Sequence, residues 1–170
     1  MTTVYWGQFM HEAAKWRFYL AATDKGLCYI GSPNADFQEV ETWVMKKINP
    51  ARFEENQNKL DVYLPELRDY LEGRTSEFSL PLHRFGTSFQ QAVWEASEQI
   101  PYGETRTYAE LAQQIGNPKA VRAVGAAIGA NPLLMIVPCH RVLAKSGNLT
   151  GFRAGLDMKE YLLDLEKATS

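Results

Sequence analysis

Cysteine is scarce in this sequence, which has only Cys28 and Cys139 among its 170 residues. The two are not spaced as C-x-x-C, and histidine occurs only three times. This pattern excludes a disulfide-rich scaffold and gives no zinc-knuckle signature. One Cys28–Cys139 disulfide is arithmetically possible, but two reduced thiols in a cytoplasmic protein are the favoured interpretation. We therefore expect no metal and no cofactor.

A basic leader and a long apolar run are also absent. Residues 1–6 contain no lysine or arginine and no extended apolar core, so we expect no signal peptide. The most apolar stretch, residues 123–139, is interrupted by Asn131, Pro132 and Pro138 and cannot cross a bilayer as an unbroken helix. With 45% hydrophobic residues, the chain is predicted to be soluble and long enough for one ordinary or two small domains.

Acidic residues are missing from one long window. The net charge is −2, yet residues 115–156 contain no Asp or Glu. A local basic face can bind phosphates even on an acidic protein, because screening confines each charge to its surroundings. A chance gap in acids is the alternative. The bases of this window are Lys119, Arg122, Arg141, Lys145 and Arg153.

The first half of the chain has the pattern of a small α/β unit. Strands are expected at residues 17–22 and 27–30, around a turn at 24–26. A helix is expected over residues 37–47, and a firmer one over 55–72 has a single apolar stripe. That stripe consists of Leu60, Tyr63, Leu64, Leu67 and Leu71.

A short extended segment at residues 78–82 leads to an expected domain boundary near 81–86. Beyond it the pattern becomes helical. Thr87 or Ser88 can cap a first helix, and Thr107 can cap a second one. We therefore expect an α/β domain followed by a mainly helical one.

The second helix, residues 108–115, ends in a Gly-Asn-Pro turn. Pro118 is well placed to open a third helix that runs to about Gly129. Two short helices around such a turn are typical of a helix-turn-helix, whose second helix enters a DNA groove. A last helix is expected over residues 157–166.

The chemistry of the chain points to residues 138–142. The apolar run before Pro138 predicts a buried strand with Cys139 at its end. Adjacent residues of an extended segment point to opposite sides, so we expect His140 to reach the thiol through a water rather than directly. A carboxylate could orient this imidazole. The acids considered are Glu160, Asp164 and Glu166, and an inert buried cysteine is the alternative.

Three segments of the second half form a specific combination: PCHRV at residues 138–142, NPKAVRAVG at 117–125 and NP at 131–132. Together they resemble the O6-alkylguanine-DNA alkyltransferase family over about residues 86–166. The first half resembles the family more weakly. The resemblance implies an RNase H-like α/β domain at residues 1–82 and a DNA-binding domain at 86–170 with a winged-helix-like helix-turn-helix.

The resemblance also implies a function. An alkyl group would pass irreversibly, once per protein, from O6-alkylguanine in DNA to Cys139 after base flipping. Whether O4-alkylthymine is a second substrate stays open. The partner would be double-stranded DNA, bound through its minor groove by a protein monomer. The alternatives are a non-catalytic protein that binds alkylated DNA and a helix-turn-helix regulator with a redox-sensing thiol.

Site residues follow from the resemblance by position. Cys139 would accept the alkyl group, His140 would remove its proton through a water, and Glu166 would orient His140. Tyr108 would contact phosphate and protonate the leaving guanine, and Asn131 would brace the active-site turn. Arg122 would replace the flipped nucleotide in the stack. Lys119, Ala120, Val121, Ala123 and Gly125 would lie against DNA, and Val142, Phe152 and Arg153 would line the base pocket.

Overall fold

The computed structural model describes residues 1–147, 149 and 152–170. Its contacts divide the chain into two compact units, residues 1–85 and 86–170. The first is built on a sheet and the second on helices, in agreement with the expected order of classes. Within the described residues, no helix combines the length and the apolar character that a membrane span requires.

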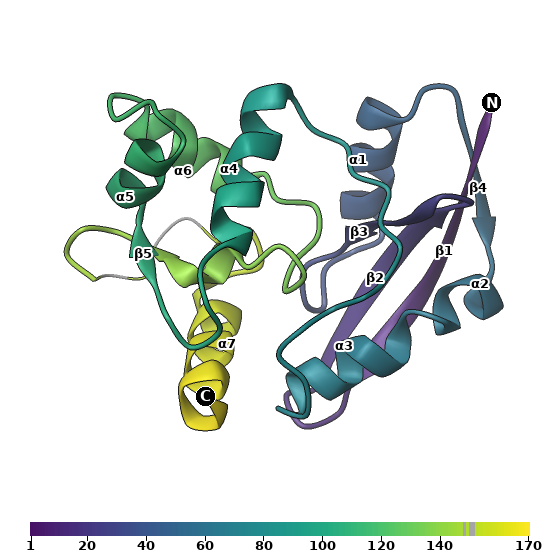
Figure 1. The fold of residues 1–170 in the computed structure, drawn as a ribbon. Coiled ribbons are helices and arrows are strands. Elements are labelled where there is room, and N and C mark those ends of the chain that lie inside the picture. The colour runs from purple at the N-terminus through teal and green to yellow at the C-terminus, as the bar shows by residue number, and fades with distance from the viewer. Residues whose placement is uncertain (148, 150–151) are drawn as a thin grey trace. The chain divides into compact units, whose positions relative to one another are not determined.

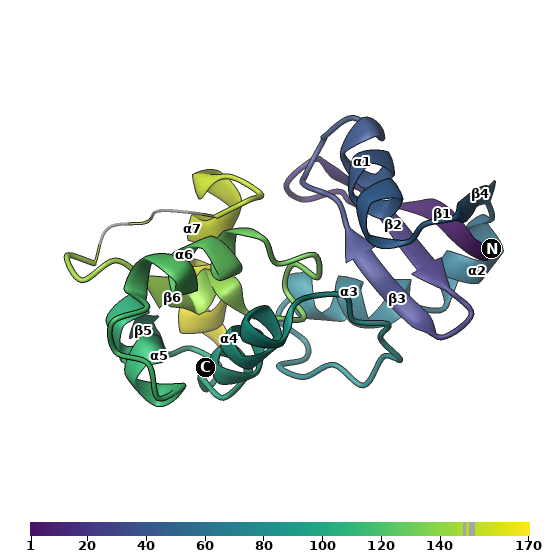
Figure 2. The same ribbon diagram turned by 90° about the horizontal axis from the view of Figure 1, so that it is seen from above.

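The first unit is built on a four-stranded sheet of order β3-β2-β1-β4 (Figures 1 and 2). β1 and β2 are antiparallel, as are β2 and β3, whereas β4 runs parallel to β1. The predicted hairpin at residues 17–30 is therefore confirmed, while β1 and β4 were not predicted. The strands are β1 (Thr2–His11), β2 (Trp16–Thr23), β3 (Gly26–Ile30) and β4 (Ala51–Glu55).

Both faces of this sheet are covered. Val4 of β1 shares a buried cluster with Val40 and Val44 of α1 (Gln38–Lys47), so α1 covers one face. Side chains alternate along a strand, so Tyr5 and Phe9 of β1 face the other side. There Lys59 of α2 (Gln57–Asp61) and Arg68 of α3 (Leu64–Leu71) lie over their rings. A sheet buried on both faces lacks simple alternation of polar and apolar residues, which explains why β1 gave no clear strand signal.

The single helix predicted over residues 55–72 is wrong. The structure has two helices there, α2 and α3, and Glu55 belongs to β4. Asn56 caps α2 by accepting a hydrogen bond from the Lys59 backbone amide. Pro65 lies in the first turn of α3, where its missing N–H costs nothing, and proline disfavours helical backbone in the residue before it. The apolar stripe continues across the break because the same face of the sheet attracts both helices.

The second unit contains four α-helices within the described residues (Figure 1): α4 (Ser88–Glu98), α5 (Tyr108–Gln114), α6 (Val121–Gly129) and α7 (Leu156–Thr169). Thr87 caps α4 and Thr107 caps α5, each in a reciprocal capping box with a side chain three residues later. Both caps were predicted. A short parallel ladder of β5 (Arg106–Thr107) and β6 (Val142–Leu143) was not predicted.

Two other expectations for this unit are wrong. Pro118 does not open the third helix, because residues 117–120 form a turn in which the Ala120 amide donates to the Asn117 carbonyl, and α6 begins at Val121. The apolar run at residues 133–137 is not a strand. It forms turns, with Met135 at a φ of 73° and the Val137 amide donating to the Leu133 carbonyl. A buried run of this length has no period that separates strand from compact turns.

Candidate active site around Cys139

Cys139 lies in η1 (Cys139–Arg141), a single turn of 3₁₀ helix, and not at the end of an extended segment as expected. Pro138 precedes the turn, and the Arg141 amide donates to the Pro138 carbonyl over 3.0 Å. Successive residues of a 3₁₀ helix point about 120° apart. Cys139 and His140 therefore still point in different directions, for a different reason than the one predicted. Both side chains are fully buried.

Asn131 holds the turns that lead to Cys139. Its side-chain nitrogen donates to the Val137 carbonyl over 2.9 Å, and its oxygen accepts from the Leu133 amide over 2.9 Å. The side chain is 1% exposed. The Arg153 guanidinium in turn donates to the Asn131 carbonyl over 3.1 Å. The buried Asn131 side chain thus links the two ends of the irregular segment at Leu133 and Val137. Val137 lies two residues before the cysteine.

The environment of the Cys139 thiol acts on its pKa in two directions. Burial is the largest effect and raises the pKa well above its ordinary value. The positive charges of Lys159 and Arg153 lower it, as do hydrogen bonds from the Asn131 and Ser97 side chains. The resting thiol is therefore protonated, and the surrounding groups stabilise the thiolate that an attack requires.

His140 and Glu166 form a buried pair. Their side chains are 0% and 1% exposed, and His140 Nε2 lies 2.7 Å from Glu166 Oε2. Burial lowers the pKa of His140, although Glu166 opposes this. His140 is therefore neutral near neutral pH and able to accept a proton. Because Nε2 is engaged by Glu166, the accepting atom is Nδ1. Glu160 and Asp164, the other acids considered, are exposed.

Arg141 was expected to contribute to a basic surface, and the structure shows that it is buried instead. Its guanidinium is buried and binds Glu166 through two hydrogen bonds, Nε to Oε1 over 2.8 Å and Nη2 to Oε2 over 2.9 Å. It also donates to the Ile100 carbonyl over 2.8 Å, and the Gly103 amide donates to Glu166 over 3.3 Å. Arg141 therefore neutralises a buried carboxylate and adds no charge to the surface.

One side of α6 is exposed and the other is buried. Val124, Ala127 and Ile128 form the buried side. The residues expected to contact DNA lie elsewhere: Val121, Arg122 and Ala123 are exposed, Ala120 and Gly125 are half-buried, and Lys119 is exposed just before the helix. A Cβ added at Gly125 would meet nothing within 4 Å. The packing of this unit does not require glycine at this position.

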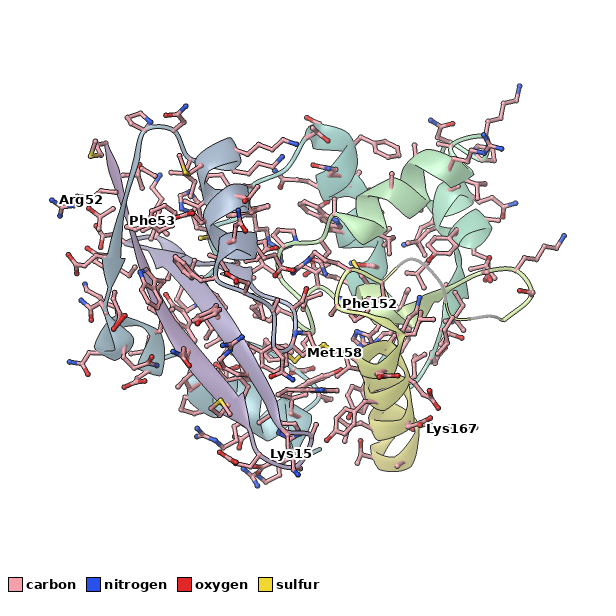
Figure 3. All side chains as sticks on the ribbon, turned by 180° about the vertical axis from the view of Figure 1, so that it is seen from behind. Lys15, Arg52, Phe53, Phe152, Met158 and Lys167 are labelled. Carbon is pink, nitrogen blue, oxygen red and sulfur yellow. The ribbon has the colours of Figure 1, made fainter. Side chains whose placement is uncertain are left out.

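The expected pocket residues all belong to the unit that contains Cys139. Val142 is fully buried and Phe152 is 8% exposed. Figure 3 labels Phe152, which precedes α7, and Met158, which lies in its first turn. Tyr108, the first residue of α5, is half-buried and directly follows the β5–β6 ladder.

Three polar residues of this site were not predicted. Lys159 is 0% exposed and donates from Nζ to the Val142 carbonyl over 2.8 Å. It lies three residues before Leu162 and seven before Glu166, so a helical wheel places all three on one stripe. That spacing was the available signal. No sequence pattern other than the PCHRV motif pointed to Arg141. None pointed to Ser97, which is fully buried in α4.

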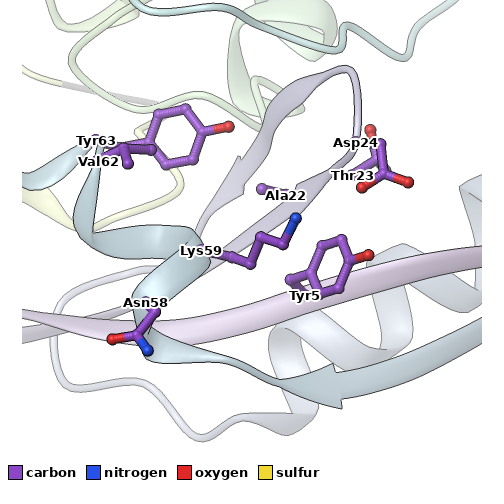
Figure 4. A pocket seen from close by; sticks show the side chains of 8 residues that line it. All are labelled: Tyr5, Ala22, Thr23, Asp24, Asn58, Lys59, Val62 and Tyr63. Atoms are coloured by element: carbon purple, nitrogen blue, oxygen red, sulfur yellow. The ribbon is translucent and has the colours of Figure 1, made fainter.

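The first unit offers different chemistry. Cys28 is also fully buried. Burial raises its pKa to about 12, and the opposing effect comes from a backbone hydrogen bond rather than from a charged side chain. A pocket of about 240 Å³ lies between β1, the end of β2 and α2 (Figure 4). Lys59 and Tyr5 line it beside Asp24, without a cysteine or histidine. The nucleophile with an adjacent imidazole is therefore in the second unit.

Comparison with known proteins gives a consistent result. Residues 4–83 match the model for the ribonuclease-like domain of 6-O-methylguanine DNA methyltransferase, and residues 88–168 match its DNA-binding domain. An inducible methylated-DNA–protein-cysteine methyltransferase of Bacillus subtilis is 49% identical over 99% of this chain and 93% of its own length. A Methanosarcina acetivorans relative of the same name is 46% identical over 86% of this chain and 89% of its own.

Solved structures agree with these sequences. The O6-methylguanine methyltransferase of Mycobacterium tuberculosis superposes with a TM-score of 0.77 at 37% identity, covering 98% of this chain and 94% of the other. The OGT protein of that bacterium in complex with DNA gives 0.76 at 35% identity with the same coverage. Matches of this extent over both units leave one conclusion: the chain belongs to the 6-O-methylguanine DNA methyltransferase family.

Proposed function

We propose that this chain repairs DNA by moving an alkyl group, typically methyl, from O6-alkylguanine to its own Cys139. The observation that carries this proposal is the buried Cys139 thiol, bordered by Lys159 and Arg153 and followed by the His140–Glu166 pair. Relatives that match nearly the whole chain are named for the same reaction. A protein that only binds lesions has no need of this arrangement around a sulfur atom.

The step balances as a substitution at carbon. His140 Nδ1 takes the thiol proton through a water, the sulfur attacks the alkyl carbon, and the carbon–oxygen bond of the base breaks. The electron pair leaves with the guanine oxygen, and Tyr108 supplies a proton to the departing base. The product is a thioether, which has no carbonyl for water to attack. The protein is therefore consumed by one reaction.

The second unit is the proposed DNA-binding part. Double-stranded DNA would lie against the exposed side of α6 through its minor groove, with Arg122 in place of the flipped nucleotide. Exposed Lys119 and Arg122 supply positive charge there, while Arg141 does not. We assign residues 86–170 to this domain, with a winged-helix-like arrangement, and residues 1–82 to an RNase H-like domain. We propose a monomer that works in the cytoplasm.

The base pocket would form around Cys139 from Val142, Phe152 and Arg153. Phe152 can stack on a base, although it has no hydroxyl group to donate. Asn131 would keep the turn before Cys139 in place through its bonds to Val137 and Leu133. Since the thiol is fully buried, the flipped base must open a path before the sulfur can attack.

The proposal is tested by intact mass after incubation with DNA that contains O6-methylguanine. We expect a gain of one methyl group per protein, located on the Cys139 peptide. Excess lesion should not raise the yield above one. Folded protein that gains no methyl would refute the transfer and leave lesion binding as the function. Repeated turnover would contradict the thioether argument.

Gly125→Ala is predicted to strengthen the fold and weaken DNA binding. Alanine is favoured over glycine inside a helix by about 0.5–1 kcal/mol, and the new methyl meets open space in the free protein. On the exposed side of α6 the same methyl would hold the helix away from DNA. Urea unfolding and a DNA titration measure the two effects. Unchanged affinity in a stabilised variant would show that DNA does not approach Gly125 closely.

Lys159→Met is predicted to slow methyl transfer and to change how stability depends on pH. Burial lowers the pKa of Lys159 from 10.5 to about 8, so between these values the unfolded chain binds more protons. The contribution of Lys159 to stability should therefore rise with pH across that window, so the free energy of unfolding of the wild type relative to the methionine variant should rise with pH there. Without the ammonium group the thiol also loses a charge that lowers its pKa.

The matched control is Lys167→Met on the same helix, where Lys167 is exposed near the end of α7 (Figure 3). It should leave both the transfer rate and the pH dependence of urea unfolding as they are in the wild type. Equal effects of the two substitutions would mean that burial of Lys159 has no role in either property.

A further inference from the structure

The side chain of Trp94 joins two helices of the second unit. Trp94 belongs to α4 and is 2% exposed. Its indole Nε1 donates to the Ala127 carbonyl, on the buried side of α6, over 2.9 Å. Because the acceptor is a main-chain atom, this bond fixes the backbone of α6 and not only one of its side chains.

The Ala127 carbonyl lies where α6 ends. In a regular helix its donor is the amide four residues later, which belongs to Asn131. The Asn131 amide donates instead to the Ile128 carbonyl over 3.3 Å, and the Ala130 amide reaches the Ala127 carbonyl over 3.2 Å. The indole therefore supplies a second, shorter bond to a carbonyl at the point where the helix gives way to the active-site turns.

The opposite edge of the indole packs against Gly86. A Cβ added at this position would collide with Cζ3 of Trp94 and lie 2.6 Å from its Cη2. The Gly86 carbonyl accepts from the Gln91 side chain over 3.2 Å, which ties this residue to α4. A ring packed this closely cannot move toward Gly86. Its N–H group is therefore held toward α6.

α6 connects the proposed DNA surface to the active site. Arg122 is exposed in its first turn, and Asn131 comes two residues after its end. The Asn131 side chain holds the turns that lead to Cys139. α4 packs both against α6 and against η1, the turn that contains Cys139. Trp94 therefore fixes α6 to the same helix against which the reactive turn rests.

We propose that Trp94 is a positioning residue: its indole N–H holds the end of α6 so that a base flipped from the bound DNA meets the Cys139 sulfur in line. This inference deepens the proposed alkyl transfer and rests on it. The thiol proton still goes to His140, and the sulfur–carbon bond forms as the carbon–oxygen bond of the base breaks. Trp94 acts only through α6, because the flipped base stays attached to the DNA that this helix binds.

Loss of the indole hydrogen bond should lower the rate of transfer within the DNA complex and leave the affinity for DNA unchanged. The exposed residues of α6 are the same in a variant altered at buried Trp94. Misplacement of reacting groups by about 1 Å can slow a reaction about a hundredfold. Trp94→Phe keeps an aromatic ring without a donor. We expect it to slow single-turnover transfer about tenfold, the upper range of what one net hydrogen bond contributes.

A sulfur analogue separates the N–H group from the volume of the indole. Site-specific replacement of Trp94 by benzothienylalanine keeps two fused rings and puts a sulfur atom in place of the N–H group. It should slow transfer as much as Trp94→Phe does. The matched control is Trp43→Phe in α1 of the other unit, where Trp43 lies 4.7 Å from the Tyr29 ring, centre to centre. This control should transfer methyl at the wild-type rate.

The experiment uses the full-length chain and four measurements. These are the affinity for unmodified DNA, the single-turnover rate at saturating O6-methylguanine DNA, the final yield of methyl per protein, and alkylation of Cys139 by iodoacetamide followed by peptide mass. For both Trp94 variants we expect only the single-turnover rate to change. A variant that was only destabilised would instead lose yield, because part of it would be unfolded, and would expose the buried thiol to faster reaction with iodoacetamide.

Several results would overturn the proposal. An unchanged transfer rate in both Trp94 variants would show that the indole N–H does not align the site. A slow phenylalanine variant beside a benzothienylalanine variant of normal rate would assign the effect to lost volume. DNA affinity that fell as much as the rate would make Trp94 a determinant of binding instead. Failure of the proposed function is distinct, because wild-type protein would then gain no methyl while its DNA affinity and iodoacetamide rate remained measurable.

Discussion

Cys139→Ser will abolish methyl transfer to the protein while leaving binding of alkylated DNA in place. A serine hydroxyl is isosteric enough to preserve packing but is far less acidic than a thiol, and His140 cannot generate a comparable nucleophile from it. The α6 surface expected to bind DNA is unchanged by this substitution. Intact mass measures the transfer, and a titration with lesion-containing DNA measures binding.

Cys28→Ser is the matched control. Both cysteines are 0% exposed, and burial raises the pKa of each. The two differ in the charges that act on their pKa values. Lysine and arginine charges favour the thiolate of Cys139, whereas the pKa of Cys28 is set by burial and a backbone hydrogen bond. The control variant should therefore gain one methyl like the wild type. Methyl transfer to Cys139→Ser, or loss of transfer in Cys28→Ser, would show that Cys139 is not the nucleophile.

Arg141→Met is expected to lower the free energy of unfolding by about 3–5 kcal/mol. It removes two hydrogen bonds from a Glu166 carboxylate that is 1% exposed, and a buried charge without its ion-pair partner is costly. The double variant Arg141→Met/Glu166→Gln should be less destabilised than the single one, because it removes that charge. Urea unfolding of the wild type, the single variants Arg141→Met and Glu166→Gln, and the double variant gives the coupling energy.

The same substitution should also make stability depend on pH in a defined direction. The Arg141 charge lowers the pKa of His140, so removing it raises that pKa. In the variant a protonated His140 can then pair with Glu166. Because the folded variant then protonates His140 at a higher pH than the folded wild type does, the difference in stability between the two proteins shrinks as pH falls. We therefore expect part of the loss to be recovered in mild acid.

Arg106→Met is the comparison for this prediction. Arg106 pairs with Glu104 over 3.2 Å, but the two side chains are 36% and 52% exposed. Exposed ion pairs contribute about 0–1 kcal/mol, so this variant should unfold nearly like the wild type. Similar losses in both arginine variants would show that burial of the Arg141–Glu166 pair contributes nothing.

Local signals in the sequence predicted much of the fold. Thr87 and Thr107 are followed three residues later by Gln90 and Glu110, and both caps form as expected. The 17–30 hairpin was predicted from its turn. Residues 55–72 were not resolved correctly, because an apolar stripe continues through the break at Val62–Tyr63. Periodicity reports which face is buried and not where the backbone is interrupted.

The site was predicted in its residues more than in its geometry. Cys139 and His140 are adjacent in sequence, whereas the acid that meets His140 is 26 positions away. Reasoning from the residues alone left Glu160, Asp164 and Glu166 open, and only the family resemblance selected among them. Arg141 was counted as a surface charge, since a charge count contains no information on burial. Partners of buried ions are fixed by tertiary packing.

The two-residue β5–β6 ladder has a consequence for the reaction. It pairs Thr107 with Leu143, so the residue before Tyr108 is hydrogen-bonded to the strand that directly follows η1. A shift by one residue would turn every side chain of a strand to its opposite face. The distance between the proposed proton donor, Tyr108, and the nucleophile, Cys139, therefore cannot change gradually while the ladder stays paired. Tyr108 is in register with the Cys139 segment, or the ladder has opened and the donor is lost.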